Sequence, residues 1–330
     1  MPPVGRARRP GPPEMAKTRL YFVSDLHGSS KCFRKFINAA PIYKADVLIL
    51  GGDVAGKAIQ SIVHQPHGRW QCTFIGTSYD VEDGPELSGL EKLIEDHGYY
   101  PYRAEPGELE ARQAQGTLED LFVDLMRERL MSWLELADER LRPQGRPLFF
   151  MLGNDDPPAL GELLDRAPWG THAEGRTVWL DDEHEMISWG YANITPWNSH
   201  REQTEDELAA AYARLADGLT RPERSVFNAH VPPFGTQIDE APQLDADLRV
   251  QAVLGQVQFA PVGSTAVREF ELSRQPLLGL HGHIHESSGI RRLGRTMVIN
   301  PGSDYSTGAL NGALVTLDGD KVTGHQLVRG

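Results

Sequence analysis

Short, continuous apolar runs recur along the chain, and each ends in glycine, asparagine, aspartate or histidine. The five runs are RLYFVSDLHG, DVLILGGDVAG, PLFFMLGND, RSVFNAHVPP and PLLGLHGHIHE. Unbroken apolar runs of this kind are typical of strands that are covered on both faces. A helical segment from Lys31 to about Ala39 follows the first run. The pattern therefore predicts an α/β fold with helices packed on buried strands.

The C-terminal half has a more antiparallel pattern. Three segments there are typical of hairpins, and the last turns at Asp318-Gly319: TVWLDDEHEMISWGYA, GIRRLGRTMVINPGS and GALVTLDGDKVTGHQLV. We therefore expect antiparallel strands beside the parallel ones, which makes the predicted sheets mixed.

An insertion at about residues 60–145 separates the second and third runs. Within it, WQCTFIGTSYDV predicts a hairpin, and TLEDLFVDLMRERLMSWLELADERL predicts an amphipathic helix. Thr117 and Asp120 resemble a capping box at the start of that helix. Residues 76–142 contain 17 acidic and seven basic residues, which supply most of the net charge of −13. The segment is either a solvated surface or a cap that narrows access to a site.

Composition limits the class of protein. The chain has 330 residues, of which 40% are hydrophobic, enough for one domain over residues 18–330. The Pro- and Arg-rich segment 1–17 is predicted to be a disordered tail, and translation could start at Met1 or Met15. The acidic charge argues against non-specific binding to nucleic acid or anionic membranes. The two cysteines lack metal-type spacing, and no apolar run is long enough to span a membrane, so the sequence predicts a cytoplasmic protein. It leaves the oligomeric state open.

Residues that commonly bind metals follow each of the five runs. They are Asp25, His27, Asp53, Asn154, His230, His283 and His285. In open α/β sheets, ligands bind beyond the carboxyl ends of the strands. Oxygen and imidazole donors suit Mn, Fe or Zn, and a carboxylate such as Asp53 can bridge two ions. Any one of these motifs is typical of an ordinary turn, but five in this order favour a metal centre.

The ordered motifs D-x-H, G-D, G-N-x-D, H and G-H-x-H resemble those of the calcineurin-like metallophosphoesterase superfamily. HVPPFGTQID and NPGSDY are similar to segments of a bacterial and archaeal subgroup of predicted phosphoesterases. The resemblance implies a four-layer α/β/β/α sandwich with two mixed sheets and a site for two divalent metal ions. It assigns Asp25, His27, Asp53 and His285 to the first ion, and Asp53, Asn154, His230 and His283 to the second.

The same resemblance implies hydrolysis of a phosphoester by a hydroxide that bridges two divalent ions, with Mn best suited in vitro. The acidic surface favours a small phosphodiester or nucleotide over a nucleic acid. A phosphomonoester or a phosphoprotein is an alternative substrate. A non-catalytic binding scaffold, like the retromer subunit that shares this fold, is the alternative class, but the complete ligand set favours an enzyme.

The chain departs from the family pattern at Asp155, which occupies the place of a histidine. Asp156 aligns with the terminal carboxylate of that motif, and Asp155, Asp156 and His230 are the predicted catalytic residues. Two interpretations of Asp155 remain open. An ionised Asp155 would repel a dianionic monoester more than a monoanionic diester. Alternatively, the apolar strand behind it keeps Asp155 protonated, and it donates the leaving-group proton.

The segment GYANITPWNSH is a second candidate region. Asn193, Thr195 and Trp197 could line a substrate pocket, with His200 as a proton donor, although turn chemistry explains the segment equally well. We interpret His281 as structural. The remaining histidines are expected at the surface: His64, His67, His97, His172, His184 and His325.

Overall fold

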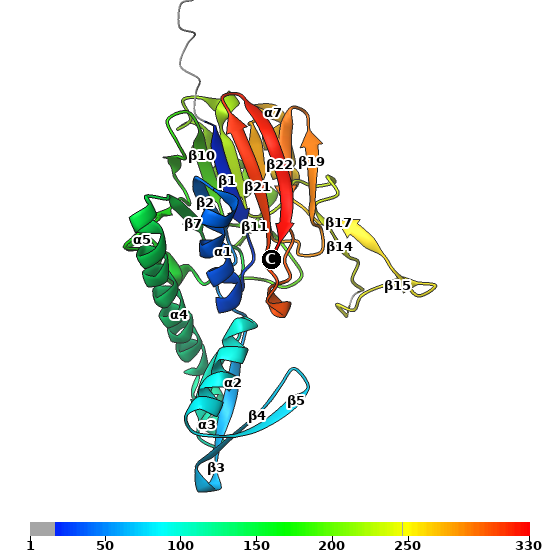
Figure 1. Cartoon of the computed structure of the whole chain (residues 1–330). Helices are drawn as coiled ribbons and strands as arrows, with labels where there is room; N and C mark the ends of the chain where they lie inside the picture. Colours follow the sequence, from blue (N-terminus) through cyan, green and yellow to red (C-terminus); the bar gives the residue numbers. More distant parts are fainter. Residues whose placement is uncertain (1–16, 246) are drawn as a thin grey trace, which may run out of the picture.

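The computed structural model describes residues 17–245 and 247–330. Met1, Met15 and almost all of the predicted tail lie outside the described residues. Two six-stranded sheets form the centre of the molecule (Figure 1). The first has the order β22 (Lys321–Arg329), β21 (Asn311–Asp318), β1 (Thr18–Val23), β2 (Val47–Gly51), β7 (Leu148–Met151), β8 (Thr171–His172). The second has the order β19 (Gly289–Leu293), β20 (Thr296–Asn300), β18 (Leu278–Leu280), β13 (Val226–Ala229), β10 (Glu185–Trp189), β9 (Thr177–Trp179).

The two sheets pack face to face, and helices cover their outer faces. On β1, Leu20 and Phe22 lie in the core between the sheets, whereas Tyr21 and Val23 pack against helices, as the two-residue period of a strand requires. The covering helices are α1 (Ser30–Tyr43) and α4 (Leu118–Leu141) on the first sheet, and α6 (Glu205–Ala216) and α7 (Thr265–Arg274) on the second. The predicted four-layer α/β/β/α sandwich is confirmed.

The C-terminal half combines parallel strands with the predicted antiparallel hairpins. Strands β10, β13, β18 and β20 run parallel, and antiparallel pairing in this sheet is confined to the edge strands β9 and β19. Helix α6 lies between β10 and β13, and α7 lies between β13 and β18. These helices provide the crossovers that parallel neighbours need. The three predicted hairpins are confirmed as β9–β10, β19–β20 and β21–β22.

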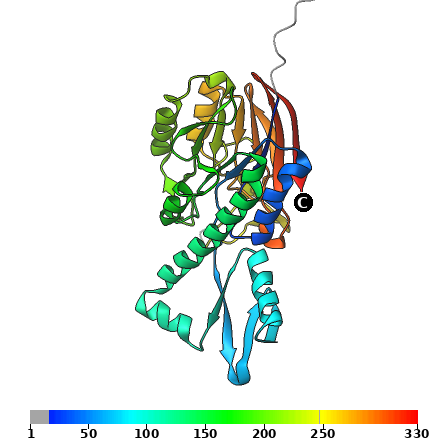
Figure 2. The same ribbon diagram turned by 60° about the vertical axis from the view of Figure 1, so that its left-hand side comes forward.

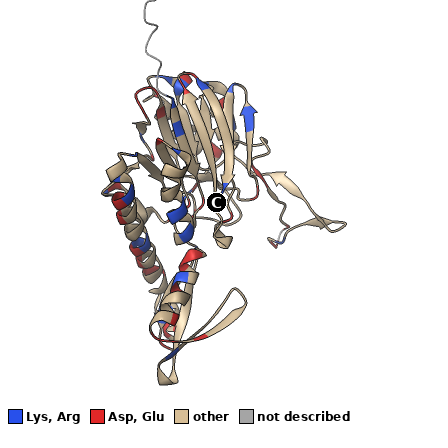
Figure 3. Cartoon of the chain, viewed as in Figure 1, with Lys and Arg blue, Asp and Glu red and all other residues tan. Residues whose placement is uncertain are grey.

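The insertion forms a small unit with a core of its own (Figure 2). Its sheet has the order β5 (Thr77–Glu82), β4 (Arg69–Phe74), β3 (Ile59–Gln65), β6 (Tyr100–Ala104), and it carries α2 (Pro85–Asp96) and α3 (Glu108–Gln115). The predicted hairpin is β4–β5. Ile62, Phe74, Leu87 and Ile94 are buried in this core. Acidic and basic residues both occur along α2 and α4 (Figure 3).

Helix α4 belongs to both units. Its C-terminal half packs on the main core, where the Trp133 ring stacks on Phe33 at 4.4 Å and its indole N–H donates to Ser30 Oγ at 3.2 Å. The predicted capping box is absent, because the Thr117 side chain makes no capping hydrogen bond. Because the C-terminal half of α4 packs on the main core, replacing all of residues 76–142 would remove part of that core.

The remaining elements are short. They are α5 (Gly161–Asp165), β11 (Ala192–Asn193), β12 (Glu202–Gln203), β14 (Glu240–Pro242), β15 (Ala252–Val253), β16 (Gln256–Val257) and β17 (Phe259–Pro261), with 3-10 turns at Pro66–Gly68, Arg142–Gln144, Pro158–Leu160, Pro222–Arg224 and Tyr305–Thr307. Strands β14 to β17 form an arm beside the second sheet (Figure 1). Across the described residues, each helix is too short or too polar to cross a bilayer.

The Trp133 contact gives a test of the packing of α4. Trp133→Ala should lower the free energy of unfolding by about 3–5 kcal/mol, because it removes a buried indole and leaves a cavity. Trp133→Phe should keep the stack and cost less. Met131→Ala, on the exposed face of the same helix, should change stability by under about 0.5 kcal/mol. Urea unfolding measures all three, and equal losses at Trp133 and Met131 would contradict this packing.

Candidate metal centre

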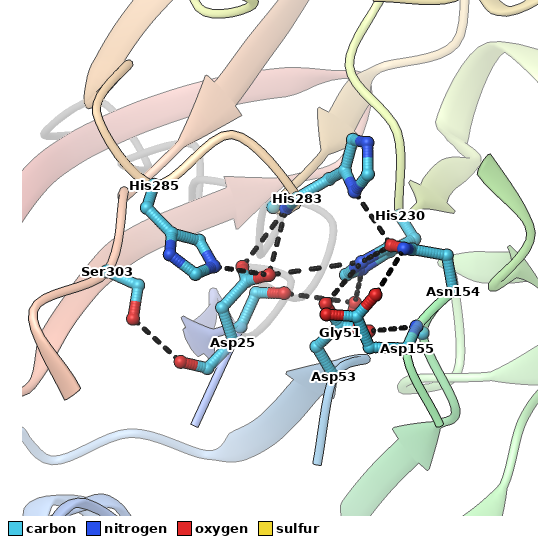
Figure 4. Close-up of polar contacts among 12 residues, drawn as sticks. Asp25, Gly51, Asp53, Asn154, Asp155, His230, His283, His285 and Ser303 are labelled. Carbon is cyan, nitrogen blue, oxygen red and sulfur yellow. Dashed lines mark hydrogen bonds and ion pairs between the residues drawn. The ribbon is translucent and has the colours of Figure 1, made fainter. Parts of the chain in front are cut away.

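All five polar motifs lie at the carboxyl ends of central strands. Loops after β1, β2 and β7 of the first sheet meet loops after β13 and β18 of the second, and their side chains converge (Figure 4). The convergent residues are Asp25, His27, Asp53, Asn154, His230, His283 and His285. The structure therefore brings together every residue that the resemblance assigned to metal binding.

The first group contains Asp25, His27 and His285, whose donor atoms all lie within 4.8 Å of one another. The Nε2 atoms of His27 and His285 are 3.0 Å apart, and His285 Nε2 is 3.5 Å from Asp25 Oδ1. Two imidazoles and a carboxylate thus face a common point, which is the arrangement that a borderline divalent ion requires.

The second group contains Asp53, His230 and His283, again within 4.8 Å. Asn154 adds a fourth donor, because its Oδ1 is 3.1 Å from His230 Nε2 and 2.7 Å from His283 Nδ1. The Nδ1–H of His230 donates to the Gly51 carbonyl at 2.8 Å, which leaves Nε2 as the nitrogen that faces the group.

Asp53 faces both groups at once. Its Oδ2 atom is 3.5 Å from His27 Nε2 and 3.4 Å from His230 Nε2. Its Oδ1 atom accepts the backbone N–H of Asp155 at 3.0 Å. One buried carboxylate therefore lies between two clusters of donors, in the position of a bridging ligand.

The backbone at these loops is strained. Asp25, His27, Asp53 and His283 have φ values of 58°, 41°, 49° and 66°. The left-handed region costs a non-glycine residue of order 1–3 kcal/mol, and such residues cluster at functional sites. Four unfavourable conformations at four convergent donors indicate that the fold is built around this cluster.

Two motif glycines allow the loops to approach. A Cβ on Gly153 would collide with the Asp53 side chain and backbone, and a Cβ on Gly282 would collide with Asp25 and Ser24. The glycines of the G-N and G-H motifs are therefore required by the close contact between neighbouring loops.

The charges in this buried cluster are strongly coupled. Burial raises the pKa of Asp25, but the hydrogen bond from His285 and the charge of His230 lower it to about 2. Burial works against the charged form of His230, yet the carboxylate of Asp53 raises its pKa to about 10. Burial and the charge of His230 lower the pKa of His283 to about 4. The cluster thus combines buried carboxylates with imidazoles, a donor set that fits divalent metal ions.

Asp156 lies beneath the site. Its buried carboxylate accepts backbone N–H groups from Gly153, Val54 and Ala55 at 2.8, 3.0 and 2.7 Å. Burial and the nearby charge of Asp53 raise its pKa to about 7. These contacts correct the catalytic assignment of Asp156, because both oxygens are occupied in tying two ligand loops together. Asp156 is a positioning residue.

Asp155 and two residues that sequence reasoning missed complete the site. Asp155 Oδ1 accepts from Asn154 Nδ2 at 2.7 Å, and its Oδ2 lies 2.6 Å from Lys57 Nζ. Asn154 Nδ2 also donates to Ser199 Oγ at 2.9 Å. Asp155 and Ser199 therefore turn the Asn154 amide so that its oxygen faces the histidines. Lys57 belongs to no motif, and Ser199 lies in the GYANITPWNSH segment but was not among its named candidates. Only the folded chain brings them to Asp155 and Asn154.

The second candidate region reaches the proposed ligands through Ser199, but the hydrogen bonds of the residues named from its sequence lie elsewhere. Asn193 Nδ2 donates to the Val262 carbonyl at 3.3 Å, and Thr195 is hydrogen-bonded to Glu202. Trp197 and His200 are exposed. Contact of these four residues with substrate stays a prediction.

The other histidines divide into structural and surface residues. His281 is fully buried, with Nδ1 2.9 Å from the Ala229 carbonyl and Nε2 3.3 Å from Glu271, as its structural interpretation requires. His184 was expected at the surface, and that is wrong. It is buried between Asp181 and the Gly319 carbonyl, a contact between distant segments that its local sequence does not signal.

Comparison with known proteins supports this architecture. No family model matches the chain. The protein TT1561 of Thermus thermophilus is similar in structure, with a TM-score of 0.52 at 13% identity over 96% of this chain and 99% of that one. A TM-score of this size indicates that the two chains share a fold. An archaeal phosphodiesterase aligns over 95% of this chain and 100% of its own, with a TM-score of 0.32 and 10% identity. At 13% identity, the likeness to TT1561 concerns the fold alone.

One curated relative matches part of the sequence. Uncharacterized protein MJ1162 of Methanocaldococcus jannaschii is 31% identical over 118 residues, which is 35% of this chain and 47% of that protein. The chain thus spans about half the length of the curated relative that it matches.

Metal binding can be tested without any substrate. Protein stripped with a chelator should gain about 2.7 kcal/mol of stability for each ion added at about 100 times its Kd, because the ion binds only the folded cluster. Thermal unfolding with and without Mn²⁺ measures this gain. Asp25→Asn should reduce it, whereas Asp181→Asn, a carboxylate held by His184 outside the cluster, should retain it. An unchanged melting temperature at every Mn²⁺ concentration would refute the site.

Proposed function

We propose that this chain is a metal-dependent phosphoesterase that acts on a small phosphodiester or nucleotide. Asp25, His27, Asp53 and His285 would hold one divalent ion, and Asp53, Asn154, His230 and His283 a second. The observation that carries the proposal is the position of Asp53 Oδ2, 3.5 Å from His27 Nε2 and 3.4 Å from His230 Nε2. Bridging carboxylates of this kind are typical of two-metal hydrolytic sites.

The chain's own residues orient the reaction. Two bound ions would supply Lewis acidity and activate a water molecule at neutral pH. Asp53 fixes the spacing of the two ligand groups, and the Gly51 carbonyl fixes the ring of His230. Asp155 and Ser199 hold the Asn154 amide with its oxygen inward. Such supporting contacts commonly change metal affinity or activity by about 10- to 100-fold.

Asp155 is poorly placed to protonate the leaving group. Both of its oxygens accept from donors, one from Asn154 and one from Lys57, so it is placed as an anion and not as a proton donor. This supports the first of the two sequence interpretations. The Lys57 ammonium offsets the negative charge, however, and so weakens the expected repulsion of monoesters. Phosphomonoesters are therefore the second candidate substrates.

Removal of the bridging carboxylate tests the proposal directly. Asp53→Asn should lower bound metal and abolish hydrolysis together, because both ligand groups lose a charged donor. Metal content by mass spectrometry and turnover across a panel of phosphoesters with Mn²⁺ measure the two effects. Asp181→Asn is the matched control and should keep both. Full hydrolysis by the Asp53→Asn protein would exclude the dinuclear model.

Leaving-group acidity tests the assignment of Asp155. Aryl phosphodiesters should be cleaved much faster than alkyl ones, since no side chain is placed to protonate a poor leaving group. Asp155→His should flatten this dependence by supplying an imidazole. Asp155→Asn should retain aryl diester cleavage. A loss of about 10²–10⁴-fold in that variant, with metals retained, would instead identify Asp155 as the general acid.

A further inference from the structure

Lys57 lies beside the candidate metal centre. It follows the Gly52-Asp53 motif, just before β3, and its Nζ atom lies 2.6 Å from Asp155 Oδ2. Its side chain is 48% exposed, whereas that of Asp155 is 25% exposed. Asp155, His27 and Asp53 each offer a donor atom within 4.8 Å of the others. The ammonium group therefore lies beside the ligand groups and on their solvent side.

Hydrogen bonds hold Asp155 and the backbone next to Lys57. The Asp155 backbone N–H donates to Asp53 Oδ1 at 3.0 Å, and its side chain accepts from Asn154. On the other side, the Gly56 N–H donates to the hydroxyl of buried Tyr100 at 2.8 Å. An ordinary exposed ion pair must order two flexible side chains, so it contributes little to stability. Here the segments that carry both charges are already held by hydrogen bonds.

We propose that Lys57 binds an anionic phosphate oxygen of the substrate that the metal ions do not hold. This inference rests on the proposed function and deepens it. An ammonium has three donor hydrogens, so Lys57 can keep one on Asp155 and direct another at the phosphate. A terminal phosphate has an additional anionic oxygen where a diester has an esterified one. Among the proposed substrates, Lys57 therefore favours nucleotides with a terminal phosphate over phosphodiesters.

A competing explanation is that Lys57 only neutralises Asp155. Asp155→Asn separates the two roles, because it removes the negative charge but leaves an amide oxygen to accept from Asn154. If Lys57 served only to neutralise, Asp155→Asn would restore phosphate binding in a Lys57→Met protein. If Lys57 contacts phosphate, the double variant should bind phosphate as weakly as Lys57→Met.

The experiment uses the full chain loaded with Mn²⁺ and inorganic phosphate as the probe. Calorimetry gives the Kd for phosphate, and mass spectrometry gives the metal content. Lys57→Met should weaken phosphate binding about 10- to 100-fold, the usual effect of a charge-assisted hydrogen bond, without loss of metal. Lys57→Arg should recover most of the affinity. Lys92→Met is the matched control, because Lys92 forms an equally short pair with Asp96 on α2.

Kinetics with one aryl leaving group add a second measurement. Lys57→Met should raise KM for the aryl monoester more than for the matching methyl aryl diester. Three results would each overturn the role of Lys57. They are wild-type phosphate affinity in Lys57→Met, a loss of phosphate affinity that is explained by missing metal, and rescue of phosphate binding by Asp155→Asn. In those cases wild-type hydrolysis would still support the proposed function. A metal-loaded wild type that neither binds phosphate nor cleaves any ester would overturn both.

Discussion

The pairing of β1 with β2 continues beyond the ends of both strands, and the site depends on that continuation. The backbone N–H groups of Asp25, His27 and Gly28 donate to carbonyls of the Gly52–Val54 segment at 3.0, 2.9 and 2.8 Å. Two ligand loops are thereby held in register like strands of one sheet. The register places a D-x-H motif beside a G-D motif, and Asp53 comes to lie between the two donor groups.

This close approach concentrates negative charge where water is excluded. Asp25 and Asp53 are buried, and neither is paired with a lysine or arginine in the described structure. Buried charges need partners of opposite sign, and here these are a protonated His230 or bound cations. Lys57 contributes its charge at the edge of the cluster, through Asp155. The electrostatics are therefore consistent with divalent ions in the interior and with an ammonium group beside them.

The sequence predicted those parts of the site that follow directly from local order. Each ligand comes immediately after an apolar strand, so strand ends and residue types together indicated the metal cluster. Ser199 and Lys57 were missed because their partners, Asn154 and Asp155, lie in other segments of the chain. Asp156 was misjudged for the same reason, since its hydrogen bonds to Val54 and Ala55 exist only after folding.

The insertion contacts the backbone of the first ligand loop, a role that neither sequence interpretation included. The Ser29 hydroxyl donates to the Asp96 carbonyl at 2.7 Å, and Arg129 donates to the Gly28 carbonyl at 2.7 Å. Gly98 packs so tightly on the His27 carbonyl that a Cβ there would collide with it. Because His27 has a strained φ, these contacts help to hold a conformation that the loop alone would not favour. The insertion thus supports the loop that carries His27, and this role does not depend on what its outer surface binds.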